Sequence, residues 1–151
     1  MAVRAPCGGS VRRPDRPQRP RPIPRGHRQG RGMTITDIVR LSPENGVATV
    51  PPIEDYEVLS AEWKETEYLA YGGPARDYSG GYWTGEPGAV RIDPWPYDEI
   101  CVILSGRVAV VDLDGGRAEF GAGDAFFIPQ GFAGDWVTVE PTSKIFVAVR
   151  R

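Results

Sequence analysis

The stretch GAGDAFFIPQGFAGDW, residues 121–136, places a short apolar run between two glycine turns. Gly123 lies just before the run and Pro129 and Gly131 follow it, so that only residues 125–128 are fully inside. A strand this short, bounded by residues suited to tight turns, is typical of a compact all-β fold. Folds of this kind often enclose a cavity that holds a metal ion, which raises the question of whether this chain has the ligands for one.

The chain after Met33 repeats this pattern of short strands and glycine turns. No segment there has a helical period of useful length. Short strands with turns about every eight to twelve residues predict an antiparallel sandwich or barrel. We expect an all-β body with strands at 66–71, 80–84, 88–92, 98–104, 107–113, 117–120, 125–128, 134–139 and 144–149, and with turns at 72–74, 86–88, 105–106 and 114–116.

Residues 1–32 differ sharply in composition from the remainder. They hold nine arginines and one acidic residue, a net charge of +8, so that the total of −2 leaves −10 for residues 33–151. A segment rich in arginine, proline and glycine buries too little apolar surface to offset its ordering entropy, so we expect a disordered basic extension. Three interpretations stay open: upstream sequence before a natural start at Met33, a basic arm for an acidic partner, or a transit-like peptide.

Partners and location follow from what the chain lacks. Residues 1–32 contain no lysine and no aromatic residue, so we expect no nucleic-acid partner of the base-stacking kind. No apolar stretch approaches the roughly 18 residues of a membrane span. Cys7 and Cys101 offer no plausible structural disulfide. We therefore expect a cytoplasmic protein that does not enter a membrane.

The run 98–104, DEICVIL, is apolar on both of its faces. Strand alternation places Glu99 and Cys101 on one face and Ile100 and Leu104 on the other. Both faces therefore require burial, and the outer one must pack on another segment or another subunit. We expect a homodimer.

Two spacings in the body resemble the motifs of the cupin superfamily. Glu99 is followed seven positions later by Gly106, and Gly123, Pro129 and Gly131 reproduce the second motif without a gap. The resemblance implies a double-stranded β-helix, a jelly-roll-like barrel, as one domain over residues 60–151. Residues 33–59 are then an irregular lead-in with one short strand near 48–50.

A narrower resemblance is to the small cupins related to (S)-ureidoglycine aminohydrolase. It rests on Gly81-Tyr-Trp83, Pro87-Gly88, Tyr97-Asp-Glu99, Gly123-Asp124, Gly134-Asp-Trp136 and Lys144. Metal-dependent cupins bind their metal through three histidines and one glutamate, a set suited to Fe, Mn, Ni or Zn. The resemblance places those histidines at Asp93, Trp95 and Gly134, and the only histidine of the chain is His27. We therefore expect no metal and no cofactor in the barrel.

The resemblance also implies the site residues. Glu99 would face the interior, where a lone carboxylate is costly, so it needs a partner such as Lys144 or the Tyr97 hydroxyl. Trp136 shares its strand face with Gly134 and should point inward. Tyr82, Trp83 and Tyr97 would line the mouth of the barrel. The predicted ligand-binding residues are Tyr97, Glu99, Trp136, Lys144 and Trp83, with Glu99 catalytic only if the protein is an enzyme.

Three functions are compatible with these residues. The first is a small-molecule-binding cupin without metal, in the metabolism of small nitrogenous or carboxylate compounds. The second is an enzyme like the ureidoglycine aminohydrolases, releasing ammonia from a ureido or amino substrate. The third is a non-catalytic interaction module. A polar, accessible pocket around Glu99 would favour the first two over the third.

Overall fold

Nine strands make up one antiparallel sheet in the computed structural model, which describes residues 32–51, 56–73 and 76–151. The strands are β1 Val47–Thr49, β2 Glu57–Val58, β3 Glu65–Gly72, β4 Tyr78–Gly85, β5 Gly88–Ile92, β6 Asp98–Asp112, β7 Arg117–Gly121, β8 Ala125–Ile128 and β9 Gly134–Val149. Two single-turn 3₁₀ helices, η1 (Ile35–Asp37) and η2 (Pro43–Asn45), precede them. The predicted all-β fold is confirmed.

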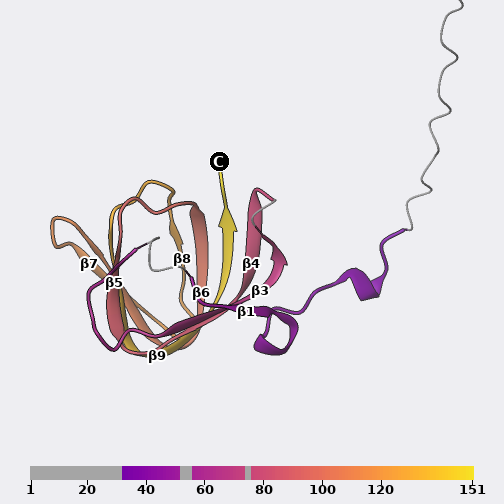
Figure 1. Ribbon diagram of the computed structural model, residues 1–151, viewed down its shortest axis with the longest axis horizontal. Coiled ribbons are helices and arrows are strands. Elements are labelled where there is room, and N and C mark those ends of the chain that lie inside the picture. The colour runs from indigo at the N-terminus through magenta and orange to yellow at the C-terminus, as the bar shows by residue number, and fades with distance from the viewer. Residues whose placement is uncertain (1–31, 52–55, 74–75) are drawn as a thin grey trace, which may run out of the picture. The chain divides into compact units, whose positions relative to one another are not determined.

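The two long strands β6 and β9 pair with each other along nearly their whole lengths and lie at the centre of the curled sheet (Figure 1). The first half of β9 pairs with β5, and its second half pairs with β4, while β6 accompanies both halves. On its other edge β6 pairs with β7 and β8. Because every pair is antiparallel and sheets twist, this pairing curls the sheet into a barrel around one interior.

The turn predicted at residues 105–106 is wrong, because β6 continues through it. Gly106 has a backbone φ of +78°, and the pairing of β6 with β9 shifts register on both sides of it. A bulge and a turn both use glycine at positive φ, which is why the sequence pattern cannot separate them. The two strands expected at 134–139 and 144–149 are likewise one strand, β9.

The lead-in at residues 33–59 contributes two strands instead of one. β1 pairs with β3 and β2 pairs with β5, so each lengthens one edge of the sheet. The predicted disordered extension, residues 1–32, lies outside the described residues except for Gly32. Within the described part of the chain, no helix has the length and apolarity that a membrane crossing requires.

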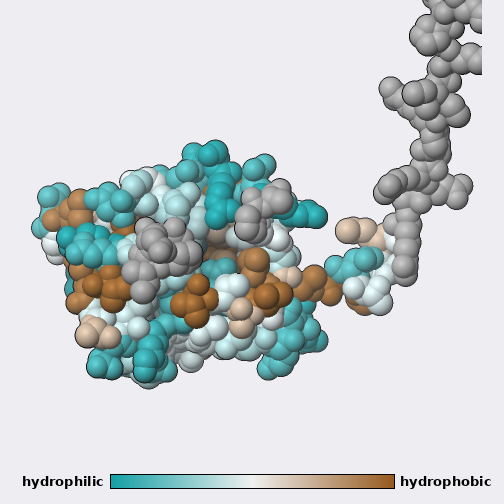
Figure 2. Space-filling model, viewed as in Figure 1, coloured by the Kyte–Doolittle hydropathy of each residue, from teal (hydrophilic) through white to brown (hydrophobic). Residues whose placement is uncertain are grey.

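The interior and exterior faces of β6 differ as alternation predicts. Glu99, Cys101 and Ile103 are buried inside the barrel. Ile100 and Leu104 are 48% and 47% exposed on the outer face, where Phe127 lies opposite Ile100. Figure 2 shows hydrophobic patches between hydrophilic ones on one side of the molecule. The expected homodimer stays a prediction. Light scattering can test it by measuring the molar mass of the full chain in solution.

We expect Gly106→Ala to lower the free energy of unfolding by about 3 kcal/mol. A side chain at positive φ costs about 1–2 kcal/mol, and its Cβ would lie 2.2 Å from the Pro141 carbonyl oxygen, an overpacking cost of roughly 1–3 kcal/mol. Gly123→Ala is the matched control, because Gly123 also has positive φ but nothing lies near its Cβ position. Urea denaturation of both variants measures the difference. Equal losses would show that the close approach to Pro141 is unimportant.

Candidate functional site

A cavity of about 60 Å³ lies inside the barrel beside β3, β4, β5 and β9. This is room for about four to six water molecules, since each requires roughly 10–15 Å³ of such space. All four tryptophans of the chain line it, together with three glutamates and one lysine. The lining residues are Pro51, Trp63, Glu65, Glu67, Trp83, Val90, Ile92, Trp95, Tyr97, Glu99, Trp136, Lys144 and Phe146.

Strand register brings the charged lining residues together. Glu67 of β3 lies opposite Trp83 of β4, and Trp83 lies opposite Lys144 of β9. Cross-strand partners share a face of the sheet, so all three side chains point into the barrel. Glu65 shares the inward face of β3 with Glu67 because the two are separated by two positions.

A buried ion pair joins Glu99 and Lys144. Nζ of Lys144 donates to Oε1 of Glu99 at 2.7 Å, and the side chains of Lys144 and Glu99 are only 7% and 5% exposed. The indole N–H of Trp95 donates to Oε2 of the same carboxylate at 2.9 Å. Backbone bonds from Trp95 to Phe132 and from Gly131 to Trp95 hold that indole in place. Both oxygens of Glu99 therefore have donors, which a buried carboxylate requires.

The Lys144 ammonium lies over two aromatic rings as well. Its Nζ is 4.1 Å from the Trp136 ring centroid and 5.2 Å from that of Trp83, distances at which the ring quadrupole attracts a cation. Burial by itself lowers the pKa of Lys144, but Cys101 and Glu99 outweigh it and raise that pKa. Lys144 is therefore a fixed cation and does not serve as a neutral amine nucleophile.

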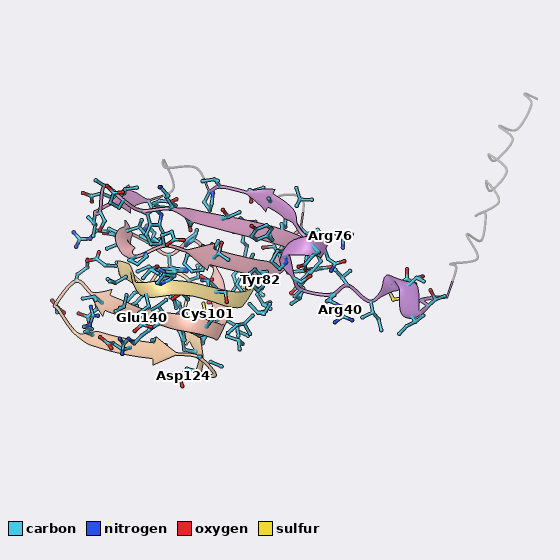
Figure 3. All side chains as sticks on the ribbon, turned by 90° about the horizontal axis from the view of Figure 1, so that it is seen from below. Arg40, Arg76, Tyr82, Cys101, Asp124 and Glu140 are labelled. Atoms are coloured by element: carbon cyan, nitrogen blue, oxygen red, sulfur yellow. The ribbon has the colours of Figure 1, made fainter. Side chains whose placement is uncertain are left out.

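The Cys101 thiol completes this cluster. It donates to Oε1 of Glu99 and accepts from Nζ of Lys144, each at 3.4 Å. Burial raises the pKa of the Cys101 thiol strongly, so the reactive thiolate is absent at neutral pH. Figure 3 shows Cys101 among the side chains between the strands, where it packs as a small apolar residue with a weak donor.

The two glutamates of β3 have different surroundings. Glu65 accepts the indole N–H of Trp83 at 2.7 Å and the hydroxyl of Tyr56. The carboxylate of Glu67 has no hydrogen bond or ion pair within the described residues. Burial, followed by the charge of Glu99, raises the pKa of Glu67. Glu67 is thus a half-buried acceptor at the cavity, and no described residue forms a hydrogen bond or ion pair with its carboxylate.

The structure places all five predicted ligand-binding residues around one cavity. Trp83, Tyr97, Glu99, Trp136 and Lys144 all line it. Of the two partners considered for Glu99, Lys144 is the one that reaches it, and Tyr97 makes no such bond. Burial raises the pKa of the Tyr97 phenol well above its ordinary value. Tyr82, also expected at the mouth, is absent from the cavity and packs against Tyr68.

Eight lining residues are missing from the predicted set, and the four of them that carry polar side-chain groups are Trp63, Glu65, Glu67 and Trp95. A signal for the two glutamates did exist, because carboxylates two apart in a strand share a face. The expected strand began at Thr66, one residue too late to include Glu65. Trp63 and Trp95 lie outside the strands, where no periodicity indicates the direction of a side chain.

The residues at the expected metal positions do not fit a metal. Trp95 donates to Glu99, whose oxygens already have an ammonium and an indole N–H as partners. At Gly134 a Cβ would lie 2.3 Å from the carbonyl oxygen of Val111, so no histidine can be accommodated without a backbone shift. In residues 32–51, 56–73 and 76–151, no group of three or more His, Cys, Asp or Glu side chains could hold a metal ion.

Solved structures with the same fold include two EutQ proteins. The putative ethanolamine utilization protein EutQ of Salmonella typhimurium is 22% identical, with a TM-score of 0.51, covering 57% of this chain and 69% of its own. EutQ of Clostridium difficile is 15% identical, with a TM-score of 0.55, covering 74% and 81%. A DUF861-family protein of unknown function from Pseudomonas syringae is 19% identical, with a TM-score of 0.57, covering 69% and 44%.

Comparison of sequences gives one similarity to a known family. No curated protein matches the chain. Residues 72–146 match the family described as the EutQ-like cupin domain, and this range contains Glu99, Trp136 and Lys144 of the cavity. The curled antiparallel sheet agrees with that match and confirms the predicted cupin fold. Residues 72–146 are therefore similar to the EutQ-like cupin domain.

Proposed function

We propose that this cupin binds a small organic ammonium compound in the cavity beside Glu67. The observation that carries the proposal is the Glu67 carboxylate, which has no partner among the residues that the structure describes and lies in a pocket lined by aromatic rings. A half-buried carboxylate without a partner is costly, and a cationic ligand would supply the missing donor. Tryptophan faces attract organic cations as well, which favours an ammonium over a neutral compound.

The charges of the cavity support the same ligand class. Three carboxylates and one ammonium line it, so the ionised groups sum to −2 and a monovalent cation leaves the site still negative. The protein already binds one ammonium in this way, because Lys144 is held by Glu99 and by the rings of Trp83 and Trp136. A ligand ammonium at Glu67 would repeat that arrangement.

The sequence analysis expected a ligand from the metabolism of small nitrogenous or carboxylate compounds. The proposal narrows that ligand class to amines. One structural neighbour, the Salmonella protein, is named a putative ethanolamine utilization protein, which is in keeping with an amine ligand. The accessible polar cavity around Glu99 favours small-molecule binding over a pure interaction module. The finer alternative, an aminohydrolase that releases ammonia, has weaker support because Glu99 and Lys144 are paired with each other.

We expect ethylamine to change the tryptophan fluorescence of the full chain, with a dissociation constant on the order of millimolar for so small a ligand. All four tryptophans line the cavity, so the signal comes from the site. Ethanol and acetamide, which are similar in size but uncharged, serve as controls. Calorimetry checks the stoichiometry. If no small ammonium compound binds while the protein is folded, the proposed function is wrong.

A further inference from the structure

An outer pocket of about 320 Å³ adjoins the cavity, toward the C-terminal ends of β3 and β9. Glu67 and Tyr97 line both spaces, so the cavity and the outer pocket meet at the Glu67 side chain. A ligand bound at Glu67 therefore has room to extend outward. The outer pocket is lined by Thr49, Val50, Pro51, Glu67, Leu69, Gly73, Ser79, Tyr97, Phe146, Ala148 and Arg150.

Arg150 is the cation of the outer pocket. The inward face of β9 runs at every second position from Lys144 in the cavity through Phe146 to Arg150, which follows the last residue of the strand. The backbone N–H of Arg150 donates to the carbonyl of Asp77 at 2.7 Å, which fixes the backbone there. The guanidinium carbon lies 5.7 Å from the centroid of the Tyr97 ring, so the charged group is placed over a residue that lines both spaces.

The Arg150 guanidinium is exposed and forms no ion pair with any carboxylate of the described residues. Its charge nevertheless acts on Glu67. Burial, followed by the charge of Glu99, raises the pKa of Glu67, whereas the charges of Lys144 and Arg150 lower it. Arg150 therefore lies close to the carboxylate proposed to hold the ammonium, while its own donors remain open to a ligand.

We propose that the ligand is a short zwitterion of the amino-acid type, whose ammonium is held at Glu67 and whose carboxylate is held by Arg150. This inference rests on the proposed function, because it adds a second contact to the same ammonium ligand. A guanidinium only donates, and its paired N–H groups match the two oxygens of a carboxylate. The outer pocket also keeps that carboxylate away from Glu65 and Glu99, which line the inner cavity alone.

Two other arrangements predict different results. If Arg150 turned toward Glu67 and paired with it, removing Arg150 would free Glu67 and strengthen the binding of every ammonium compound, amino acids included. If the anionic group were a phosphate, a phosphonate would bind more tightly than a carboxylate. One arginine close to three glutamates favours the singly charged carboxylate over a doubly charged phosphate, because the glutamates repel the second charge as well.

The test measures the affinity of the full chain for glycine, 3-aminopropionate and 4-aminobutyrate, and for their carboxamides. Each amide keeps the length and the ammonium of its amino acid but lacks the negative charge. We expect at least one amino acid to bind roughly three- to fivefold more tightly than its amide, because ion pairs of exposed arginines are modest. Arg150→Gln should abolish this preference and bind ethylamine at least as tightly as the wild type. Arg40→Gln is the matched control, since Arg40 is also exposed but lines neither space.

The possible outcomes are distinct. Equal affinity for every amino acid and its amide overturns the zwitterion inference and leaves the ammonium site intact. A preference that survives in Arg150→Gln overturns it as well, and so does tighter binding of 3-aminopropionate by that variant than by the wild type. Tighter binding of 2-aminoethylphosphonate than of 3-aminopropionate overturns the carboxylate as the anionic group. If ethylamine, the amides and the amino acids all fail to bind the folded protein, the proposed function itself fails.

Discussion

Replacing Lys144 with methionine is expected to lower the free energy of unfolding by about 3–5 kcal/mol, the usual cost of removing one partner from a buried ion pair. The loss leaves Glu99 with the indole N–H of Trp95 and the weak Cys101 thiol as its donors. Urea denaturation followed by circular dichroism measures the change. Lys64→Met is the control, since Lys64 is the only other lysine and is exposed. We expect that variant to stay within about 0.5 kcal/mol of wild type.

A double-mutant cycle shows whether the loss in the free energy of unfolding comes from the interaction between Glu99 and Lys144. Glu99→Gln keeps the shape of the side chain and leaves an oxygen for Trp95, but it leaves the Lys144 ammonium without its counter-charge. The double variant Glu99→Gln with Lys144→Met should therefore cost less than the sum of the single variants. Additive losses would mean that the two groups act independently, against the 2.7 Å contact between them.

The stability that the pair supplies should not depend on pH near neutrality. The pKa of Lys144 is raised in the folded protein, so its contribution is fully present below the ordinary lysine value of about 10.4. That contribution is lost only as the pH rises through the higher folded-state pKa. The cycle can therefore be measured at neutral pH without correction for lysine titration.

The barrel could be predicted from the sequence because the turn residues and the strand alternation that specify it are local features. The spacing of Gly123, Pro129 and Gly131 marks a turn at each end of β8, and the structure has that strand at the expected residues. The cupin resemblance, together with strand alternation, predicted the inward direction of Glu99 and Trp136. The continuity of β6 through Gly106 could not be predicted from the sequence, because the pairing with β9 decides whether this glycine forms a turn or a bulge.

The cavity was only partly predictable, for a different physical reason. Glu99 and Lys144 were found through motif resemblance, which points to positions near the family's usual site. Glu67, whose carboxylate has no partner among the described residues, does not belong to those motifs, and neither does Trp63 of the cavity lining. A glutamate in a short strand is ordinarily a solvent-facing residue, and only the burial of the opposite residue Trp83 identifies Glu67 as inward.

Glu67→Gln is expected to weaken the binding of ethylamine by roughly 10- to 100-fold. Hydrogen bonds to charged groups contribute about 1.5–3 kcal/mol, and each 1.4 kcal/mol is about tenfold in affinity. The amide keeps an acceptor oxygen but removes the charge that attracts the ammonium. Fluorescence titration and calorimetry measure the loss. Glu119→Gln is the matched control, because Glu119 is exposed on β7 and does not line the cavity.

The same substitution should leave the unliganded protein at least as stable as wild type at neutral pH. Burial raises the pKa of Glu67 in the folded state, so the carboxyl favours folding below its unfolded value of about 4.3 and that contribution is lost as the pH rises through the folded-state pKa. Above that pH the charge opposes folding, and glutamine removes it. A residue kept for structure would lose stability when replaced, whereas one kept for a ligand loses affinity alone. A large loss of stability with unchanged amine binding would therefore show that Glu67 belongs to the fold and not to the site.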